Sequence, residues 1–367
     1  MYEKKLNMKI TFILSSANIN GGTKVIAMYA KYLSLRGHQV VVLCAGPRHL
    51  SWKKRIKKYV FNSKSEQSYF SLEYFNCMSV PIKIMDRYRE IVDDDIPDGD
   101  VVISTFWLTA DWVRNLSKSK GVKVGLYQGF EISPECSNER NEGIIKSWEM
   151  PFVKIVVSSW LKSIAKDRFG DNEVRLVSNG VACEDLLRER RSQNKKKVVG
   201  FLFSDNWFKA PEMYVDLVEH FQKINKDIDF IAFGSCCGDK LPSSVNYIRK
   251  PKQNEIGDIY AACDVWVCAS RQEGFGLPIL EAMARRTPVV STRIGAAEDL
   301  ITDGVNGYVV SVDDLDAIIK VVLKLLCMNP DEWCSYSEQA YNTAVMHTVD
   351  LATTEFEAVL YSIVGNN

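Results

Sequence analysis

Short apolar, β-branched runs alternate along the chain with segments whose apolar residues recur at helical spacing. The first unit has an apolar run at 9–15, a glycine-containing loop and a helical pattern at 25–36, followed by the apolar run QVVVLC. This order predicts a β-α-β unit. Further strands are predicted at 100–105, 122–127, 154–159 and 173–181. Such alternation is typical of a parallel sheet covered by helices on both faces.

The polar segment RERRSQNKKK, at 188–197, interrupts this alternation and is the best candidate for a linker. Strand-like runs then resume as KVVGFLFS, DFIAFGS, NYIRK, DVWVCAS and PVVST, with a helix expected over 212–223 and a helical tail over 330–364. Residues 51–99 fit the pattern worst. The pattern therefore predicts an α/β protein with two Rossmann-like sheets, whose ligands bind at the carboxyl ends of the strands.

Composition agrees with two globular domains. The chain has 367 residues, of which 46% are hydrophobic and 25% charged, and its formal net charge is zero. A neutral chain lacks the broad basic surface that non-specific nucleic-acid binding requires, so no nucleic-acid partner is expected. The ten cysteines show no CxxC spacing, which favours free thiols in a reducing cytosol over a zinc or redox site.

Membrane insertion is not expected from the sequence. The apolar run at 10–14 is too short for a signal peptide, and no stretch approaches the roughly 18 apolar residues of a membrane span. The basic and aromatic segment SWKKRIKKYVFNSK, at 51–64, fits either a solvated surface helix or a surface that docks on an anionic membrane. We therefore expect a cytoplasmic protein, with peripheral contact at the inner membrane face as a hypothesis.

The segment RQEGFGLPILEAMARRTPVV, at 271–290, carries the most distinctive chemistry. It places Glu273 on a strand-to-helix loop and Glu281 in the helix that begins near Pro278. Glycines at 274 and 276 leave the backbone amides of the helix start open to an anion. A carboxylate beside a phosphate repels it, so the two glutamates suit sugar and ribose hydroxyls. An ordinary βα loop with a glutamate near the helix N-terminus is the alternative.

The longer run SRQEGFGLPILEAMARRTPVVSTRIGAAEDLITDGVNGYVV closely resembles the signature of glycosyltransferase family 4. These are retaining, nucleotide-sugar-dependent enzymes of the GT-B fold. The resemblance covers most of the second half and matches the first half more loosely, through NINGGTKVIAMYAKYLSLRGHQVVVL and VSNGV. It implies an N-terminal acceptor domain at 1–182, completed by a returning C-terminal helix at 347–367, and a donor domain at 183–346.

The resemblance also implies roles for individual residues. Glu273 is expected to hold hydroxyls of the donor sugar and Glu281 the nucleotide ribose, while Lys209 neutralises the diphosphate as it leaves. A solvated lysine at a helix start is the alternative for Lys209. The further donor contacts are expected at Gly22, Gly274, Phe275, Gly276 and Leu277, with Lys250 near the base. No metal and no cofactor are expected besides the UDP-, GDP- or dTDP-sugar substrate.

The sequence departs from the family pattern at several positions. Where members carry an arginine shortly before the lysine, this chain offers Ser204, so neutralisation falls on Lys209 or on Arg271. The usual first-domain histidine is missing, and Gln128 and Glu131 are the acceptor-side candidates in its place. Glu131 is either a base for the acceptor hydroxyl or a solvated loop residue.

A further departure is Arg286, which stands where members commonly have glycine, and the sequence offers no reason for it.

The expected reaction transfers a sugar, with retention, to a glycan, lipid-linked or other hydroxyl acceptor in cell-surface polysaccharide or glycolipid synthesis. Same-face attack as the diphosphate departs is preferred over a covalent intermediate on Glu273. Two alternatives from other classes are a GT-B nucleotide-sugar epimerase and a catalytically inactive GT-B subunit.

Overall fold

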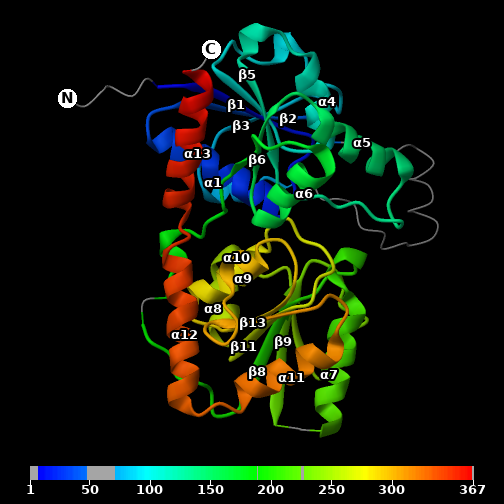
Figure 1. Cartoon of the computed structure of the whole chain (residues 1–367), viewed down its shortest axis with the longest axis vertical. Coiled ribbons are helices and arrows are strands. Elements are labelled where there is room, and N and C mark those ends of the chain that lie inside the picture. Colours follow the sequence, from blue (N-terminus) through cyan, green and yellow to red (C-terminus); the bar gives the residue numbers. More distant parts are fainter. Residues whose placement is uncertain (1–6, 48–70, 188, 225–226, 366–367) are drawn as a thin grey trace.

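The computed structural model describes residues 7–47, 71–187, 189–224 and 227–365. Two parallel sheets stand one above the other (Figure 1). The first is seven-stranded, in the order β3-β2-β1-β4-β5-β6-β7. Its strands are β1 (Lys9–Leu14), β2 (Gln39–Cys44), β3 (Ile82–Ile84), β4 (Val101–Ser104), β5 (Val122–Tyr127), β6 (Val153–Val156) and β7 (Arg175–Leu176).

The second sheet is six-stranded, in the order β10-β9-β8-β11-β12-β13. Its strands are β8 (Lys197–Leu202), β9 (Ile228–Gly234), β10 (Val245–Arg249), β11 (Val265–Cys268), β12 (Val289–Thr292) and β13 (Gly307–Val310). The strand order reverses beside the first strand of each sheet, where β1 pairs with β4 and β8 pairs with β11. Doubly wound sheets bind ligands at this point of reversal. The two Rossmann-like sheets expected from the alternation are therefore confirmed.

Helices flank both sheets. In the first domain they are α1 (Gly21–Leu35), α3 (Glu73–Cys77), α4 (Trp107–Asn115), α5 (Asn138–Glu149) and α6 (Ser159–Phe169), with 3₁₀ turns η1 (Asp93–Asp95) and η2 (Lys118–Lys120). Between the domains lies η3 (Cys183–Asp185). The later elements are η4 (Trp207–Lys209), α7 (Pro211–Ile224), α8 (Gln253–Ala261), α9 (Leu277–Ala284), α10 (Ala297–Leu300), α11 (Leu315–Leu326), α12 (Pro330–Val345) and α13 (Val349–Val364).

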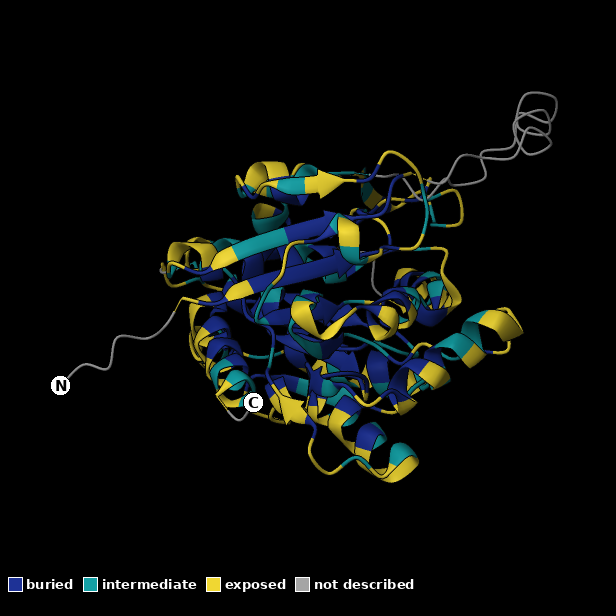
Figure 2. Ribbon diagram, turned by 90° about the horizontal axis from the view of Figure 1, so that it is seen from above, coloured by how far each residue is buried: buried dark blue, intermediate teal, exposed yellow. Residues whose placement is uncertain are grey.

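The sheets form the buried interior, and the outer faces of the helices are exposed (Figure 2). One cluster of buried apolar side chains continues from the first domain into the second and includes Phe12, Phe356, Phe275 and Leu277. The two domains therefore meet through packed side chains around the motif that contains the glutamates.

The chain crosses between the domains twice, and the two crossings pair with each other. The Val181 amide donates to the His347 carbonyl at 2.9 Å, and the Val349 amide donates to the Val181 carbonyl at 2.8 Å. A Cβ on Gly180 would lie 2.3 Å from the backbone carbon of Thr348, so only glycine permits this approach. The strand expected over 173–181 is consequently confined to β7, because its later residues form the crossing.

The tail is two helices, with a break where a continuous helical stretch was expected. The side chain of Thr348 caps α13 by accepting from the Leu351 amide at 3.4 Å. Helix α12 remains with the second domain, whereas α13 packs against α1 of the first (Figure 1). The expected return of the C-terminal helix to the first domain is confirmed.

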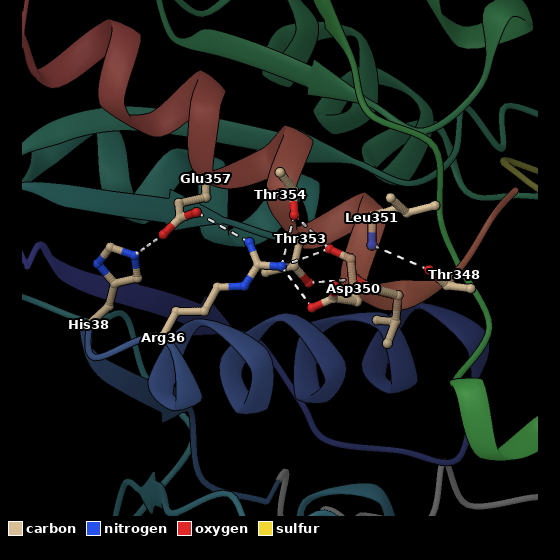
Figure 3. A network of polar contacts seen from close by, with 9 residues as sticks. Arg36, His38, Thr348, Asp350, Leu351, Thr353, Thr354 and Glu357 are labelled. Carbon is tan, nitrogen blue, oxygen red and sulfur yellow. Dashed lines mark hydrogen bonds and ion pairs between the residues drawn. The ribbon is translucent and has the colours of Figure 1, made fainter. Parts of the chain in front are cut away.

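A polar network fastens α13 to the first domain (Figure 3). The Met8 amide donates to His38 Nδ1 at 3.0 Å, so His38 donates from Nε2 to Glu357 Oε1 at 2.8 Å. Arg36 donates to the other oxygen of Glu357 at 3.2 Å and to Asp350 at 2.8 Å. His38 and Glu357 are buried, and their hydrogen-bonding groups therefore satisfy one another.

The basic segment at 51–64 lies outside the described residues.

Candidate functional site

Glu273 and Lys209 form an ion pair, although 64 residues separate them in the sequence. Lys209 ends η4, in the loop that follows β8, and Glu273 lies in the loop after β11. These strands are neighbours in the second sheet, so their carboxyl-end loops lie side by side. Ser270 donates to the same carboxylate oxygen at 2.8 Å. The sheet order thus brings two of the expected catalytic residues together.

Lys209 keeps its positive charge in this pair. Burial disfavours the ammonium of Lys209, but the Glu273 carboxylate outweighs that effect and raises the pKa of Lys209. Lys209 is therefore a cation at neutral pH. Cys268, directly before this loop, has its thiol pKa raised to about 11 by burial. It stays a neutral thiol near pH 7 and is not an activated nucleophile.

Glu281 lies on α9 and contacts both domains. Its Oε1 accepts from Lys24 of α1 at 2.6 Å, and its Oε2 accepts from Tyr260 of α8 at 2.7 Å. Burial favours the neutral acid, but Lys24 outweighs it and lowers the pKa of Glu281. Glu281 is the fifth residue of α9, just past its first turn, so it lies in the helix as the sequence predicts.

The two glycines of the motif serve different purposes. Gly276 precedes α9 with φ of 92°, a left-handed conformation that glycine adopts readily. At Gly274, a Cβ would lie 1.6 Å from the backbone oxygen of Gln128. Gly274 therefore admits the backbone of the opposite domain. From the sequence alone, this space is expected to admit a ligand to the backbone.

Phe275 and Leu277, on either side of Gly276, have buried side chains. The carbonyl of Phe275 accepts from the Ala296 amide at 2.8 Å, which fixes this loop against the one after β12. Gly295, also in that second loop, is needed because a Cβ there would lie 2.7 Å from the same carbonyl. The amides at the start of α9 are thereby held in a rigid position.

The first domain contributes Gln128 and Glu131 from the loop after β5. Gln128 donates to the carbonyl of Gly22 at 3.2 Å, and Glu131 pairs with Arg140 of α5 at 2.8 Å. Burial lowers the pKa of Lys209 and Glu273 raises it most, and the Glu131 carboxylate adds a smaller raising effect. The Glu131 carboxylate is therefore close enough to Lys209 to act on its charge across the domain boundary, and the backbone of Gln128 lies against Gly274.

Gly22 lies inside the first turn of α1, because the Asn20 side chain caps that helix by accepting from Thr23 at 2.8 Å. The helix thus begins four residues before the expected start at 25. A Cβ on Gly22 would meet its neighbours at 3.5 Å or more, which is ordinary contact.

Two expected donor-binding residues have side-chain partners other than Glu273 and Lys209. The Arg271 guanidinium stacks on Trp207 and pairs with Glu212 and Asp313. Ser204 accepts from the amide of Asn206 at 3.3 Å within its own loop. Lys250 follows β10 with a positive φ of 52°.

Sequence reasoning missed Lys24, Tyr260, Ser270 and Arg140 as partners of the glutamates. Ser270 ends the strand run three residues before Glu273, and that position could have signalled it. Lys24 carried no such signal, because its partner is 257 residues away on another domain.

The described residues hold no group of three or more His, Cys, Asp or Glu side chains arranged for a metal ion. Within the same residues, no helix combines the length and the apolar character needed to span a bilayer.

Comparison with known proteins is consistent with this arrangement. A profile of the family described as glycosyl transferases group 1 matches residues 196–328. The lipopolysaccharide core mannosyltransferase LpsB of Rhizobium meliloti is 44% identical over 70 residues, which are 18% of this chain and 20% of that protein. D-inositol 3-phosphate glycosyltransferase of Corynebacterium urealyticum is 33% identical over 292 residues, 68% of each chain. Neither name favours the epimerase or inactive-subunit alternative.

Among solved structures, Anabaena HepE in complex with UDP-glucose matches with a TM-score of 0.72 and 15% identity, covering 97% of this chain and 100% of that one. At this identity the likeness shows the fold, which is the expected GT-B fold. The family profile and the relative matched over two thirds of its length show that the chain belongs to the group 1 glycosyltransferases, of the family 4 type.

Proposed function

We propose that this chain is a retaining glycosyltransferase that moves a sugar from a nucleoside-diphosphate sugar to a hydroxyl acceptor. Family membership establishes a glycosyltransferase. Retention and the nucleotide-sugar donor are what the resemblance to glycosyltransferase family 4 implies. The observation that carries the proposal is the Glu273–Lys209 pair beside the start of α9, opposite Gln128 and Glu131. At the boundary between the two domains, it brings together carboxylate oxygens that can accept hydrogen bonds from sugar hydroxyls, the ammonium of Lys209 and backbone amides.

The donor diphosphate would lie between Lys209 and the first amides of α9. Negative charge collects on the diphosphate as the glycosidic bond breaks, and a preorganised ammonium stabilises that charge in the transition state. Glu273 then accepts hydroxyl hydrogen bonds from the sugar, and Ser270 keeps its carboxylate in place. We assign charge neutralisation to Lys209 and expect turnover without a metal ion.

On the acceptor side, we propose that Glu131 and Gln128 meet the attacking hydroxyl. Arg140 engages one oxygen of Glu131 and orients that carboxylate. We propose same-face attack, in which the departing phosphate takes the acceptor proton. A polysaccharide or lipid-linked glycan acceptor is proposed by analogy with the named relative that acts in lipopolysaccharide core biosynthesis.

The test uses the purified chain with UDP-, GDP-, dTDP- and ADP-sugars, with and without EDTA. We expect consumption of one donor class, unaffected by EDTA, with the product anomer matching that of the donor by NMR. Glu273→Gln and Lys209→Met should each lower kcat/KM by roughly 10²-fold.

The matched controls are Glu219→Gln and Lys223→Met on the exposed face of α7, which should leave the rate unchanged. An inverted anomer would contradict the proposed retention. A covalent sugar adduct on Glu273, detected by mass spectrometry, would replace same-face attack by a double displacement.

A further inference from the structure

Lys24 connects the first domain to a glutamate of the donor motif. Its Nζ lies 2.6 Å from Glu281 Oε1, and both side chains are mostly buried, with exposed fractions of 19% and 16%. No role for Lys24 follows from the family signature in the second half of the chain, because the residue comes from α1 of the other domain. The carboxylate expected to bind ribose therefore has a partner supplied across the domain boundary.

The hydrogen bonds that described residues make to Glu281 leave part of its acceptor capacity unused. Lys24 occupies one position on Oε1 and Tyr260 occupies one on Oε2. An ionised carboxylate has about four acceptor positions, so about one remains on each oxygen. Two free positions on neighbouring oxygens match the vicinal 2′ and 3′ hydroxyls of a ribose. The two protein donors fix the carboxylate plane in which those positions lie.

The surroundings of Lys24 depend on how the two domains meet. At the start of α1, a Cβ on Gly21 would lie 3.1 Å from Leu277 Cδ1, so the first turns of α1 and α9 are in contact. Asp185, in the segment between the domains, attracts Lys24 and pairs with Arg285 at 3.5 Å. A helix from each domain and the connecting segment thus converge on one ammonium group.

We propose that Lys24 is a positioning residue of the donor site, which orients Glu281 for the nucleotide ribose and completes the ribose site only when the domains are in contact. The inference rests on the proposed function, because it takes Glu281 as the ribose ligand. It adds that donor affinity depends on a first-domain side chain. Donor binding and domain contact are then coupled through one ion pair.

A purely structural ion pair would behave differently. Partly buried pairs lose solvation on forming and contribute little net stability, so stability alone is a poor reason for this one. A structural role predicts a change in unfolding temperature without a change in nucleotide affinity. A positioning role predicts weaker nucleotide binding from a chain that remains folded.

The experiment titrates UDP, GDP, dTDP and ADP separately into the full-length chain by calorimetry. For the nucleotide that binds the native protein, Lys24→Met should raise Kd roughly tenfold, the loss of one charge-assisted orienting bond. Lys24→Arg should restore most of the affinity. The control Lys31→Met, further along the same helix, should bind like the native chain.

Steady-state kinetics provide the second measurement. Lys24→Met should raise KM for the donor sugar with kcat changed less than about threefold, because the residue does not contact the reacting atoms. In a double variant, the effects of Lys24→Met and Glu281→Gln on the free energy of nucleotide binding should not add up to the sum of the two single effects. An unchanged Kd in folded Lys24→Met, additive effects, or a loss confined to kcat would each overturn the proposal.

The titration separates this inference from the proposed function, because nucleotide binding needs no turnover. If the native chain binds a nucleotide but transfers no sugar, the proposed function fails. The comparison of nucleotide Kd between the native chain and Lys24→Met still tests the positioning role. If the native chain binds none of the four nucleotides, the positioning role is overturned as well.

Discussion

Gly274 shows how a single position can be recognised from sequence for the wrong reason. The sequence marks it as an open approach to the backbone, but that space belongs to the backbone of Gln128. Ser158 of the first domain also donates to the Gly274 carbonyl at 2.7 Å. The missing side chain therefore lets two domains touch beside the donor motif, and the conformational freedom of glycine is secondary here.

Gly274→Ala should impair transfer through misplacement of the domains. Its Cβ would clash with backbone atoms, which cannot rotate away as a side chain can. We expect kcat/KM to fall by roughly 10²-fold, because a small displacement of groups in an active site can lower the rate by about that factor. The control is Gly129→Ala on the facing loop, whose Cβ would make ordinary contacts at 3.7 Å. Equal rates in the two variants would refute the steric argument.

At the scale of elements, Arg286 joins α9 to α12. It has φ of 62°, in the left-handed region, which accounts for the glycine common there in the family. Its guanidinium donates to the Leu187 carbonyl at 2.7 Å, pairs with Glu338 at 2.6 Å and stacks 3.9 Å from the centre of Tyr341. These side-chain contacts of Arg286 hold α12 against α9, the helix of the donor motif, and offset the strain of the left-handed backbone.

Arg286→Gly and Arg286→Ala separate backbone strain from side-chain contacts. Both lose the contacts, which should cost about 1–3 kcal/mol of unfolding free energy. Only glycine relieves the left-handed strain, so alanine should be less stable than glycine by about 1 kcal/mol. Urea unfolding of the three proteins measures this order. A glycine variant more stable than the native chain would show that the contacts contribute less than the relief of strain and do not offset it.

In the molecule as a whole, helix α13 stabilises the first domain, although it follows the second domain in the sequence. Arg36 and His38, at the end of α1 and just beyond it, both contact Glu357 of α13 (Figure 3). Phe356 also stacks on Tyr29 of α1, with ring centres 4.3 Å apart. The first domain is consequently completed by a segment that follows the entire second domain, which makes its folding dependent on a late part of the chain.

Glu357→Ala should destabilise the first domain by about 3 kcal/mol, because it leaves a buried histidine and a mostly buried arginine without their shared partner. Glu355→Ala, an exposed position on the same helix, is the control and should change stability by less than about 0.5 kcal/mol. Chemical denaturation followed by circular dichroism provides the comparison. Equal losses in the two variants would show that the network does not fasten α13.

Local signals in the sequence are enough to predict the two α/β halves and the donor motif. Apolar alternation, glycine and proline positions and the spacing of Glu273 and Glu281 are local signals, since each is set by neighbours along the chain. The observed helix ends differ from the predicted ones where a capping side chain sets the boundary. Helix α1, for example, begins before the predicted residue because the side chain of Asn20 caps it. Arg286 remained unexplained because its backbone angle and its partners on α12 are not visible in the sequence.

Which side chains meet depends on the tertiary structure. Lys209 reaches Glu273 because β8 and β11 are neighbours in the sheet, and Lys24 reaches Glu281 because the domains pack together. Arg271 lies two residues before Glu273, yet its side chain pairs with Glu212 and Asp313. Such pairings depend on strand order and on packing between residues from 42 to 257 positions apart in the sequence, and periodicity along a chain holds no information about either.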